Sequence, residues 1–184
     1  MLSQKNLAPI ILLLVSALTF HIYLYTLSPT VHTGDSGELI AAGYSLGVAH
    51  NPGYPLYSMI GKAFCLMGFG NIAFSMNLMS AVCAVLASCF LFLSVYRITG
   101  RILPSTFGAL LLATSTTVWW QAVVAEVYTL HLLSLSILGY GLTRFLTDKD
   151  RRWLYLCAFI FGINLTHIFL NASTLSTEGY AKSF

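Results

Sequence analysis

Long apolar stretches without charged residues recur along this chain and are separated by short polar connections. A membrane-spanning helix needs about 20 mostly apolar residues. Five stretches come close to that requirement, at residues 7–27, 73–95, 102–119, 127–143 and 153–170. The pattern therefore predicts an all-α integral membrane protein, a multi-pass helical bundle with about five spans. A long loop, residues 28–71, follows the first span, and residues 171–184 form a polar tail.

The composition supports a membrane protein and excludes two other classes. Of the 184 residues, 57% are hydrophobic and only 8% are charged, whereas soluble domains contain about 25% charged residues. Nine Lys and Arg give a net charge of +3, too few to form the basic face of a nucleic-acid-binding protein. The cysteines lack metal-ligand or redox spacing, so we expect no metal site and interpret them as small packing residues. They are Cys65, Cys83, Cys89 and Cys157.

Lys and Arg fall mainly in alternate connections between the predicted spans, and cytoplasmic loops are enriched in both. Seven of them share one side, namely Lys5, Arg97, Arg101, Arg144, Lys149, Arg151 and Arg152. The opposite side has Lys62 in its long loop and Lys182 in the tail. We therefore predict a cytoplasmic amino terminus and a loop 28–71 that lies outside the cell or in a lumen. No small-residue cleavage site follows the first span, so we interpret it as a retained anchor.

Polar residues gather at the outer ends of the predicted spans. Ionisable groups in a membrane are costly and usually face a bundle interior or a watery cavity, so their common depth predicts a polar cavity that opens outward. Each residue alone is more typical of packing, and Trp119 and Trp120 are typical of an interfacial aromatic belt. The polar set comprises His21, Asn77, Thr114 to Thr117, Glu126, His131, Asn164 and His167.

The long loop has the pattern of an ordered segment rather than that of a linker. We predict a short helix over Leu39–Val48, with Leu39, Ala42 and Leu46 on one face at helical spacing. Pro52 and Gly53 should reverse the chain, and Pro55 should keep it extended. A second short helix should begin near Tyr57.

Asp35 and Glu38 are the only acidic residues of this loop and stand at the start of its first predicted helix. Two roles are compatible with that position. An acidic N-cap followed three residues later by Glu is typical of a capping box, which the residues alone slightly favour. A carboxylate beside an outward cavity could instead act as general base on an acceptor hydroxyl that attacks a lipid-linked sugar.

Four runs of residues carry a resemblance to a known family. Gly34-Asp-Ser-Gly-Glu-Leu-Ile40, Leu46-Gly-Val-Ala-His50 and Pro52-Gly-Tyr-Pro-Leu-Tyr57 resemble the first outer loop of the transmembrane protein 260 family. Ala125-Glu-Val-Tyr-Thr-Leu130 resembles a second motif of that family. Together the motifs lie in order over most of residues 1–170. Asn51 stands where the family usually has a proline, a mild change that keeps the chain reversal.

The resemblance implies a GT-C-type glycosyltransferase fold and protein O-mannosylation. Animal members would transfer mannose from dolichyl phosphate mannose to Ser or Thr of receptor ectodomains, including plexin-type immunoglobulin-like domains. They would do so in the endoplasmic reticulum membrane, whereas bacterial relatives sit in the inner membrane. By motif, Asp35 would be the catalytic base with Glu38 as its neighbour. Candidate substrate-binding residues are His50, Tyr54, Tyr57, Glu126 and His131. Apart from the lipid-linked donor no cofactor and no metal is expected.

The family continues with further spans and a soluble lumenal region, so we expect residues 1–170 to be the amino-terminal part of such an enzyme. The outer side offers few cations for a phosphate leaving group, which needs positive charge or N–H donors. Part of the donor site is therefore expected to be missing, and activity of this fragment in isolation is left open. The alternative is a non-catalytic multi-pass protein, such as a transporter subunit or an assembly partner, in which the acidic residues only cap a helix.

Overall fold

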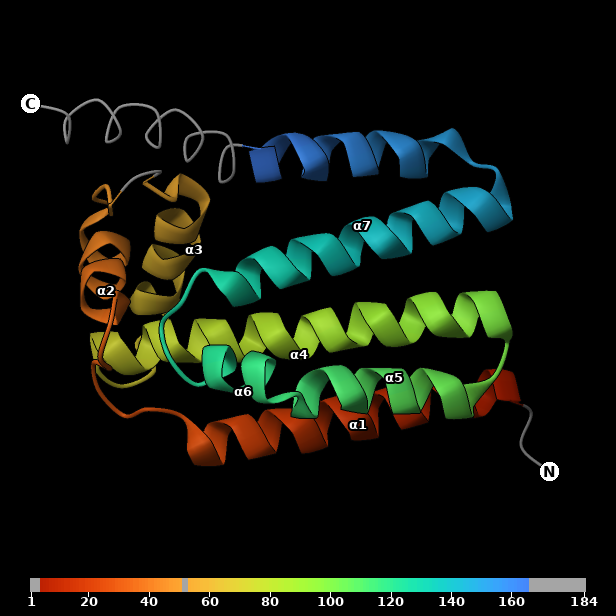
Figure 1. The fold of residues 1–184 in the computed structure, drawn as a ribbon, viewed down its shortest axis with the longest axis horizontal. Helices are drawn as coiled ribbons and strands as arrows, with labels where there is room; N and C mark the ends of the chain where they lie inside the picture. The colour runs from red at the N-terminus through yellow and green to blue at the C-terminus, as the bar shows by residue number, and fades with distance from the viewer. Residues whose placement is uncertain (1–3, 51–52, 166–184) are drawn as a thin grey trace, which may run out of the picture.

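The apolar stretches form long helices that lie side by side and alternate in direction (Figure 1). The structure is a computed structural model and describes residues 4–50 and 53–165. The long helices are α1 (Gln4–Thr26), α4 (Ile72–Thr99), α5 (Ile102–Thr114) and α7 (Tyr128–Asp148), and a further helical segment covers residues 151–165. Three shorter helices are α2 (Ser36–Ser45), α3 (Pro55–Leu66) and α6 (Thr116–Ala122). The described residues contain no strand, and the all-α expectation is confirmed.

Helix α4 forms the centre of the bundle and packs against α1, α3, α5 and α7. Many of its buried positions are small, and Ala81, Ala84 and Ala87 are fully buried. Small residues let helix backbones approach closely, which is how helices associate in a membrane in the absence of a strong hydrophobic driving force. The interior is therefore built on α4, and the other elements take their positions from it.

Two helices are long and apolar enough to cross a membrane, α1 and α4. They match the first two predicted spans. The third predicted span is present as a bent pair, because α5 and α6 meet at 63° and count as a third span only together. Helix α7 has 21 residues but is not one of these candidates, since its polar residues lower its mean hydropathy. The fifth predicted span is helical over 153–165, and its remainder lies outside the described residues.

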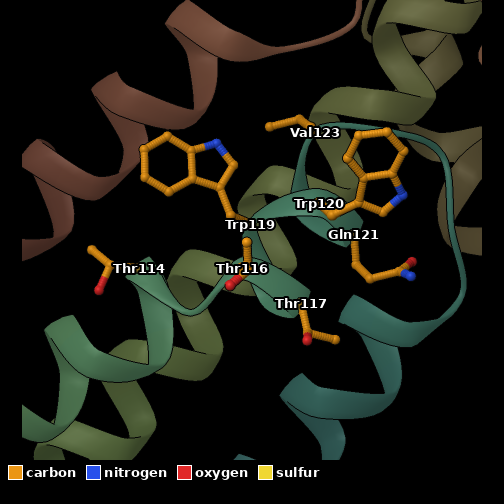
Figure 2. A pocket seen from close by; sticks show the side chains of 7 residues that line it. All are labelled: Thr114, Thr116, Thr117, Trp119, Trp120, Gln121 and Val123. Carbon is orange, nitrogen blue, oxygen red and sulfur yellow. The ribbon is translucent and has the colours of Figure 1, made fainter.

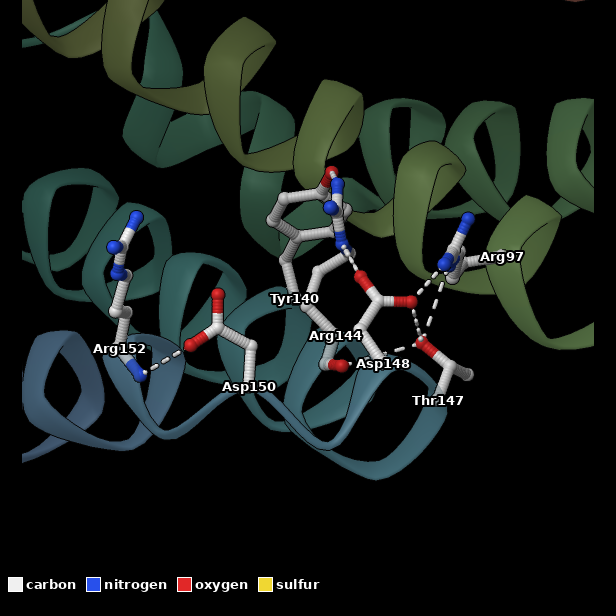
Figure 3. A network of polar contacts seen from close by, with 7 residues as sticks. All are labelled: Arg97, Tyr140, Arg144, Thr147, Asp148, Asp150 and Arg152. Atoms are coloured by element: carbon white, nitrogen blue, oxygen red, sulfur yellow. Dashed lines mark hydrogen bonds and ion pairs between the residues drawn. The ribbon is translucent and has the colours of Figure 1, made fainter.

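The two ends of the bundle differ in charge. Arg97 at the end of α4 and Arg144 near the end of α7 both bind the Asp148 carboxylate (Figure 3). Arg144 also donates to the Tyr140 hydroxyl at 3.0 Å. We call this the cation end. At the opposite end lie α2, α3 and the connection 123–127, and we call it the loop end.

The short helices of the loop end differ in detail from the expectation. Helix α2 begins three residues earlier than predicted, and Leu46, expected on its apolar face, is 56% exposed. Leu46 ends the helix in a left-handed conformation (φ 55°), which turns its side chain away from the face that Leu39 and Ala42 bury. Pro55 does not keep the chain extended: it is the first residue of α3, where its missing N–H costs nothing.

Helices α2 and α3 cross at two glycines above a buried methionine. A Cβ added at Gly61 would lie 2.6 Å from Met76 Cε and 3.5 Å from the Gly43 Cα. Met76 is completely buried and therefore has little room to move away. The close approach of α2 to α3 depends on the absence of a side chain at this crossing.

Replacing Gly61 by Leu is therefore expected to push α2 away from α3. Overpacking of this kind costs about 1–3 kcal/mol, which should appear as a lower melting temperature of the purified protein in detergent. Gly139→Leu is the matched control, because a Cβ at Gly139 on α7 meets nothing within 4 Å. Equal melting temperatures for the two variants would show that the crossing is not tight.

Candidate active site

Two connecting segments are hydrogen-bonded to α4 at the loop end. The Asn77 side chain, fully buried, donates to the Ser28 and Thr30 carbonyls at 2.7 and 3.1 Å. Ser80 exchanges hydrogen bonds with the backbone of Glu126, whose N–H donates to the Ser80 hydroxyl at 3.3 Å. These contacts place the segment before Asp35 and the segment around Glu126 side by side.

Asp35 does not cap helix α2, so the capping-box interpretation is wrong. Its backbone already has helical dihedral angles (φ −79°, ψ −5°) and its side chain makes no capping hydrogen bond. An N-cap side chain reaches the backbone N–H groups only from a non-helical conformation. The Asp35 carboxylate is therefore free of that role, and its side chain is 65% exposed.

Glu38 binds His50 instead of the start of its own helix. Its carboxylate accepts a hydrogen bond from the His50 backbone N–H and contacts His50 Nδ1 at 3.1 Å. The other ring nitrogen of His50, Nε2, lies 3.9 Å from Asp35 Oδ2. The imidazole thus lies between two carboxylates, and all three side chains are open to the surroundings.

Tyr54 and Glu126 complete this cluster. The Tyr54 ring meets the His50 ring edge to face, with centroids 5.5 Å apart. Burial raises the pKa of Tyr54, and the charges of Tyr128, Asp35, Glu126 and Glu38 raise it further. Tyr54 also has a left-handed backbone (φ 44°), which is strained for an aromatic residue and typical of functional sites.

Glu126 has an environment that disfavours its charge. Burial raises the pKa of Glu126, and the Asp35 charge raises it further, while His50 and His32 act in the opposite direction. The acids Asp35, Glu38 and Glu126 and the imidazoles His32 and His50 therefore share one electrostatic neighbourhood. We call these five residues with Tyr54 the carboxylate cluster.

The raised pKa of Glu126 predicts a pH-dependent stability. The folded protein binds the Glu126 proton more tightly than the unfolded chain does, so stability falls as the pH rises above the ordinary pKa of 4.5. Glu126→Gln is expected to raise the melting temperature at pH 7 by a small amount, equivalent to less than about 1 kcal/mol because the group is partly exposed. At pH 4 the variant and the original protein should melt together. A constant difference at both pH values would contradict the assignment.

The structure brings together five of the seven residues predicted for the site, namely Asp35, Glu38, His50, Tyr54 and Glu126. Tyr57 is completely buried beneath the cluster, and its hydroxyl has no hydrogen-bond partner within the described residues. His131 lies on α7, half-buried, and no contact recorded for the described part of the chain joins it to the cluster. The functional roles of all seven stay predictions.

His32, a member of the cluster, and its neighbour Trp120 are not among the residues predicted for the site. The His32 ring lies edge to face against the Trp120 ring, with centroids 5.2 Å apart, and His32 acts electrostatically on Glu126. His32 stands three residues before Asp35. Its position as an ionisable residue in the same run could have indicated that it belongs to the site. Trp120 was assigned to the aromatic belt, and its sequence position gives no sign of the contact with His32.

The residues that the structure describes contain no group of three His, Cys, Asp or Glu side chains placed to hold a metal ion. The cluster offers carboxylates that can accept a proton from a hydroxyl group, with an imidazole held between two of them. It also offers an aromatic ring, Tyr54, beside that imidazole. This combination suits general base chemistry on an alcohol at an open surface.

Comparison with known proteins places the chain beside one family. The sequence model described as "Protein O-mannosyl-transferase TMEM260 N-terminal domain" matches residues 35–180. A Mus musculus protein named "Protein O-mannosyl-transferase TMEM260" is 34% identical over 125 residues, covering 67% of this chain and 18% of the relative. A Dictyostelium discoideum protein named "Protein O-mannosyl-transferase tmem260" is 31% identical over 182 residues, covering 90% of this chain and 22% of the relative.

The chain thus spans about a fifth of the length of these curated relatives. No solved structure matches it. The family match begins at Asp35, so it includes every residue of the carboxylate cluster except His32.

Proposed function

The chain belongs to the family of protein O-mannosyl-transferase TMEM260 N-terminal domains, and on that premise we propose that it supplies the catalytic carboxylate of a membrane-bound protein O-mannosyltransferase. The donor is a mannose carried on a polyprenyl phosphate, dolichyl phosphate mannose in a eukaryote. The acceptor is a Ser or Thr hydroxyl of a protein domain on the non-cytosolic side, such as an immunoglobulin-like domain of a plexin-type receptor. No cofactor other than the lipid-linked donor takes part.

The reaction that we propose needs one proton acceptor. An Asp35 carboxylate oxygen takes the proton of the acceptor hydroxyl while the hydroxyl oxygen forms a bond to the anomeric carbon of mannose. The bond between that carbon and the phosphate oxygen breaks, and its electron pair leaves with the lipid phosphate. Proton removal by a positioned base contributes about 10²- to 10⁴-fold in rate.

The observation that carries this assignment is the release of Asp35 from helix capping. A carboxylate that accepts hydrogen bonds from a helix start is a weaker base, whereas the Asp35 side chain makes no such bond and is open to an incoming hydroxyl. Glu38 is occupied by His50. Of the two acidic residues in the loop, Asp35 is therefore the better candidate for the base.

His50 and Glu38 act in this proposal as positioning residues. Glu38 fixes both the backbone and the ring of His50, and the ring in turn lies beside Asp35. A protonated His50 would hold the Asp35 carboxylate in place and offset its charge. The leaving phosphate requires more positive charge than His50 supplies. Lys62, the lysine of the loop, already donates to the Tyr44 carbonyl at 2.6 Å. We assign the remaining charge to parts of the longer relatives that this chain does not cover.

We place the loop end on the lumenal side of the endoplasmic reticulum membrane, with the amino terminus in the cytosol. The support is the concentration of Lys and Arg at the cation end, since such residues are enriched in cytoplasmic loops. The carboxylate cluster at the opposite end would then meet acceptor domains as they enter the lumen.

A transfer assay tests the function. Membranes that contain the full-length protein are incubated with radiolabelled dolichyl phosphate mannose and a purified immunoglobulin-like acceptor domain. Label in the acceptor, removed by an α-mannosidase, is the expected result. Accumulation of label inside sealed vesicles with none in the acceptor would contradict transfer and favour the transporter alternative.

A further inference from the structure

The third predicted span is broken at a fixed place. The α5 helix ends at Thr114, and Ser115 starts α6 by accepting a hydrogen bond from the Val118 N–H. The Tyr23 hydroxyl of α1 donates to the Ala113 carbonyl at 2.7 Å, so a carbonyl freed by the break is satisfied. Non-helical backbone at membrane depth is tolerated where it is buried in protein or lines a cavity. The break is therefore a built feature of the bundle.

A cavity of about 610 Å³ opens at this break. Its lining includes Trp119, Trp120, Thr117 and Gln121. Figure 2 shows the two indoles pointing to opposite sides of α6, Trp119 towards α1 and Trp120 towards the connection to α7. Trp119 donates to the Thr26 hydroxyl at 3.1 Å and Trp120 packs on His32. Both rings are thus held by protein contacts in addition to any role in an aromatic belt.

A smaller cavity of about 160 Å³ adjoins the first, because Thr117 and Gln121 line both. Tyr128 and Thr129 of α7 line its other side. The Gln121 Oε1 and the Thr129 hydroxyl are buried and have no hydrogen-bond partner within the described residues. Buried polar atoms are normally paired, and a ligand with hydroxyl groups would pair both.

The larger cavity shares Trp120 with the surroundings of the carboxylate cluster. Trp120, which lines the larger one, contacts His32, and His32 and Asp35 both act on Glu126. Tyr128, which lines the smaller one, acts on Tyr54. A molecule in the larger cavity would therefore lie against Trp120, whose ring also contacts His32 of the carboxylate cluster.

We propose that this paired cavity binds the lipid-linked sugar donor, with the isoprenoid chain beside Trp119 and Trp120 and the sugar hydroxyls at Gln121 and Thr129. The assignment rests on the proposed function for the identity of the donor. The chemistry of the walls supports it: indole rings line the larger cavity at the break, and the residues that line the smaller one include Gln121 and Thr129, whose side-chain oxygens have no hydrogen-bond partner within the described residues. A ligand with an apolar chain and a polyol end matches both parts.

Photolabelling of the full-length protein tests the site without relying on activity. Membranes are irradiated with a diazirine-bearing polyprenyl phosphate mannose, and labelled peptides are mapped by mass spectrometry. We expect label within residues 114–123, displaced by excess unlabelled donor lipid and not by phosphatidylcholine. Label elsewhere only, or displacement by phosphatidylcholine at the same concentration, would overturn the proposal. Specific label here would support it even if no transfer to protein were found.

Two variants test the site by kinetics. Gln121→Leu removes the shared amide and should raise the KM for the donor roughly 10-fold, the effect of losing one hydrogen bond to a ligand. Trp120→Ala should raise it as well. Phe107→Ala is the matched control, because Phe107 is an exposed aromatic residue of α5 outside the cavity lining. An unchanged donor KM in both cavity variants, with transfer intact, would overturn the donor site and leave the transferase function standing.

Discussion

Replacement of Asp35 by Asn is expected to reduce mannosyl transfer by at least about 100-fold, because the amide cannot accept the proton of the acceptor hydroxyl. Folding should be unaffected, since the Asp35 side chain caps no helix and is mostly exposed. The reduction should fall on kcat, with little change in the KM for either substrate. It is measured as initial rates in membranes that contain equal amounts of each protein.

Asp150→Asn is the matched control for this substitution. Asp150 is an exposed acid near the cation end, where its side chain accepts from the Arg152 N–H. We expect the original rate and the original melting temperature for that variant. Normal transfer by Asp35→Asn would remove Asp35 from the role of base.

Substitution of Glu38 by Gln should lower kcat about 10- to 100-fold, less than the loss expected for the base itself, because a positioning residue supports only part of the about 10²- to 10⁴-fold contribution of general base catalysis. The substituted side chain could still accept from the His50 N–H, but it would no longer present a second carboxylate oxygen to His50 Nδ1. Asp35 would then lose the orienting contact at 3.9 Å. The KM for the donor should stay near its original value, because Glu38 is not part of the donor cavity.

A double-mutant cycle distinguishes this positioning role from a general structural one. Glu38→Gln, His50→Gln and the double variant are compared, and residues that act as a unit are not additive. The double variant should lose little more kcat than either single variant. Fully additive losses would mean that Glu38 and His50 act independently, and a lower melting temperature for Glu38→Gln would indicate a structural effect.

The long helices could be predicted from hydropathy because a helix pairs its backbone groups within one segment of sequence. Helices α1 and α4 follow directly from their apolar runs. The break after Thr114 could not be predicted in the same way. It depends on the Tyr23 hydroxyl, which is 90 residues away from the Ala113 carbonyl that it binds.

Most residues of the site could be predicted from the sequence, whereas the contacts among them could not. The spacing of Asp35 and Glu38 indicated a local capping box, whereas Glu38 forms its bonds across 12 residues to His50. That pairing requires the chain reversal before α3 and the close crossing of α2 over α3 at Gly43 and Gly61. A local sequence pattern does not indicate which distant residue Glu38 will bind or where α2 will cross α3.

The contact between His32 and Trp120 could not be predicted because it joins residues that are far apart in the sequence. His32 and Trp120 meet because the Ser28 N–H donates to the Val123 carbonyl at 3.0 Å and thereby joins the two outer connections. An aromatic residue at the end of a span is typical of a membrane interface, so its sequence context favoured that assignment for Trp120.

Asp35 can meet a protein acceptor in the lumen only if the loop end faces that compartment. Thr33→Cys, exposed at the loop end, and Lys149→Cys, exposed at the cation end, allow a direct measurement with a membrane-impermeant maleimide on sealed microsomes. The unsubstituted chain corrects for its own cysteines. We predict that the thiol at position 149 reacts in intact microsomes and the thiol at position 33 only after permeabilisation. The reverse order would place the carboxylates in the cytosol and contradict the assigned function.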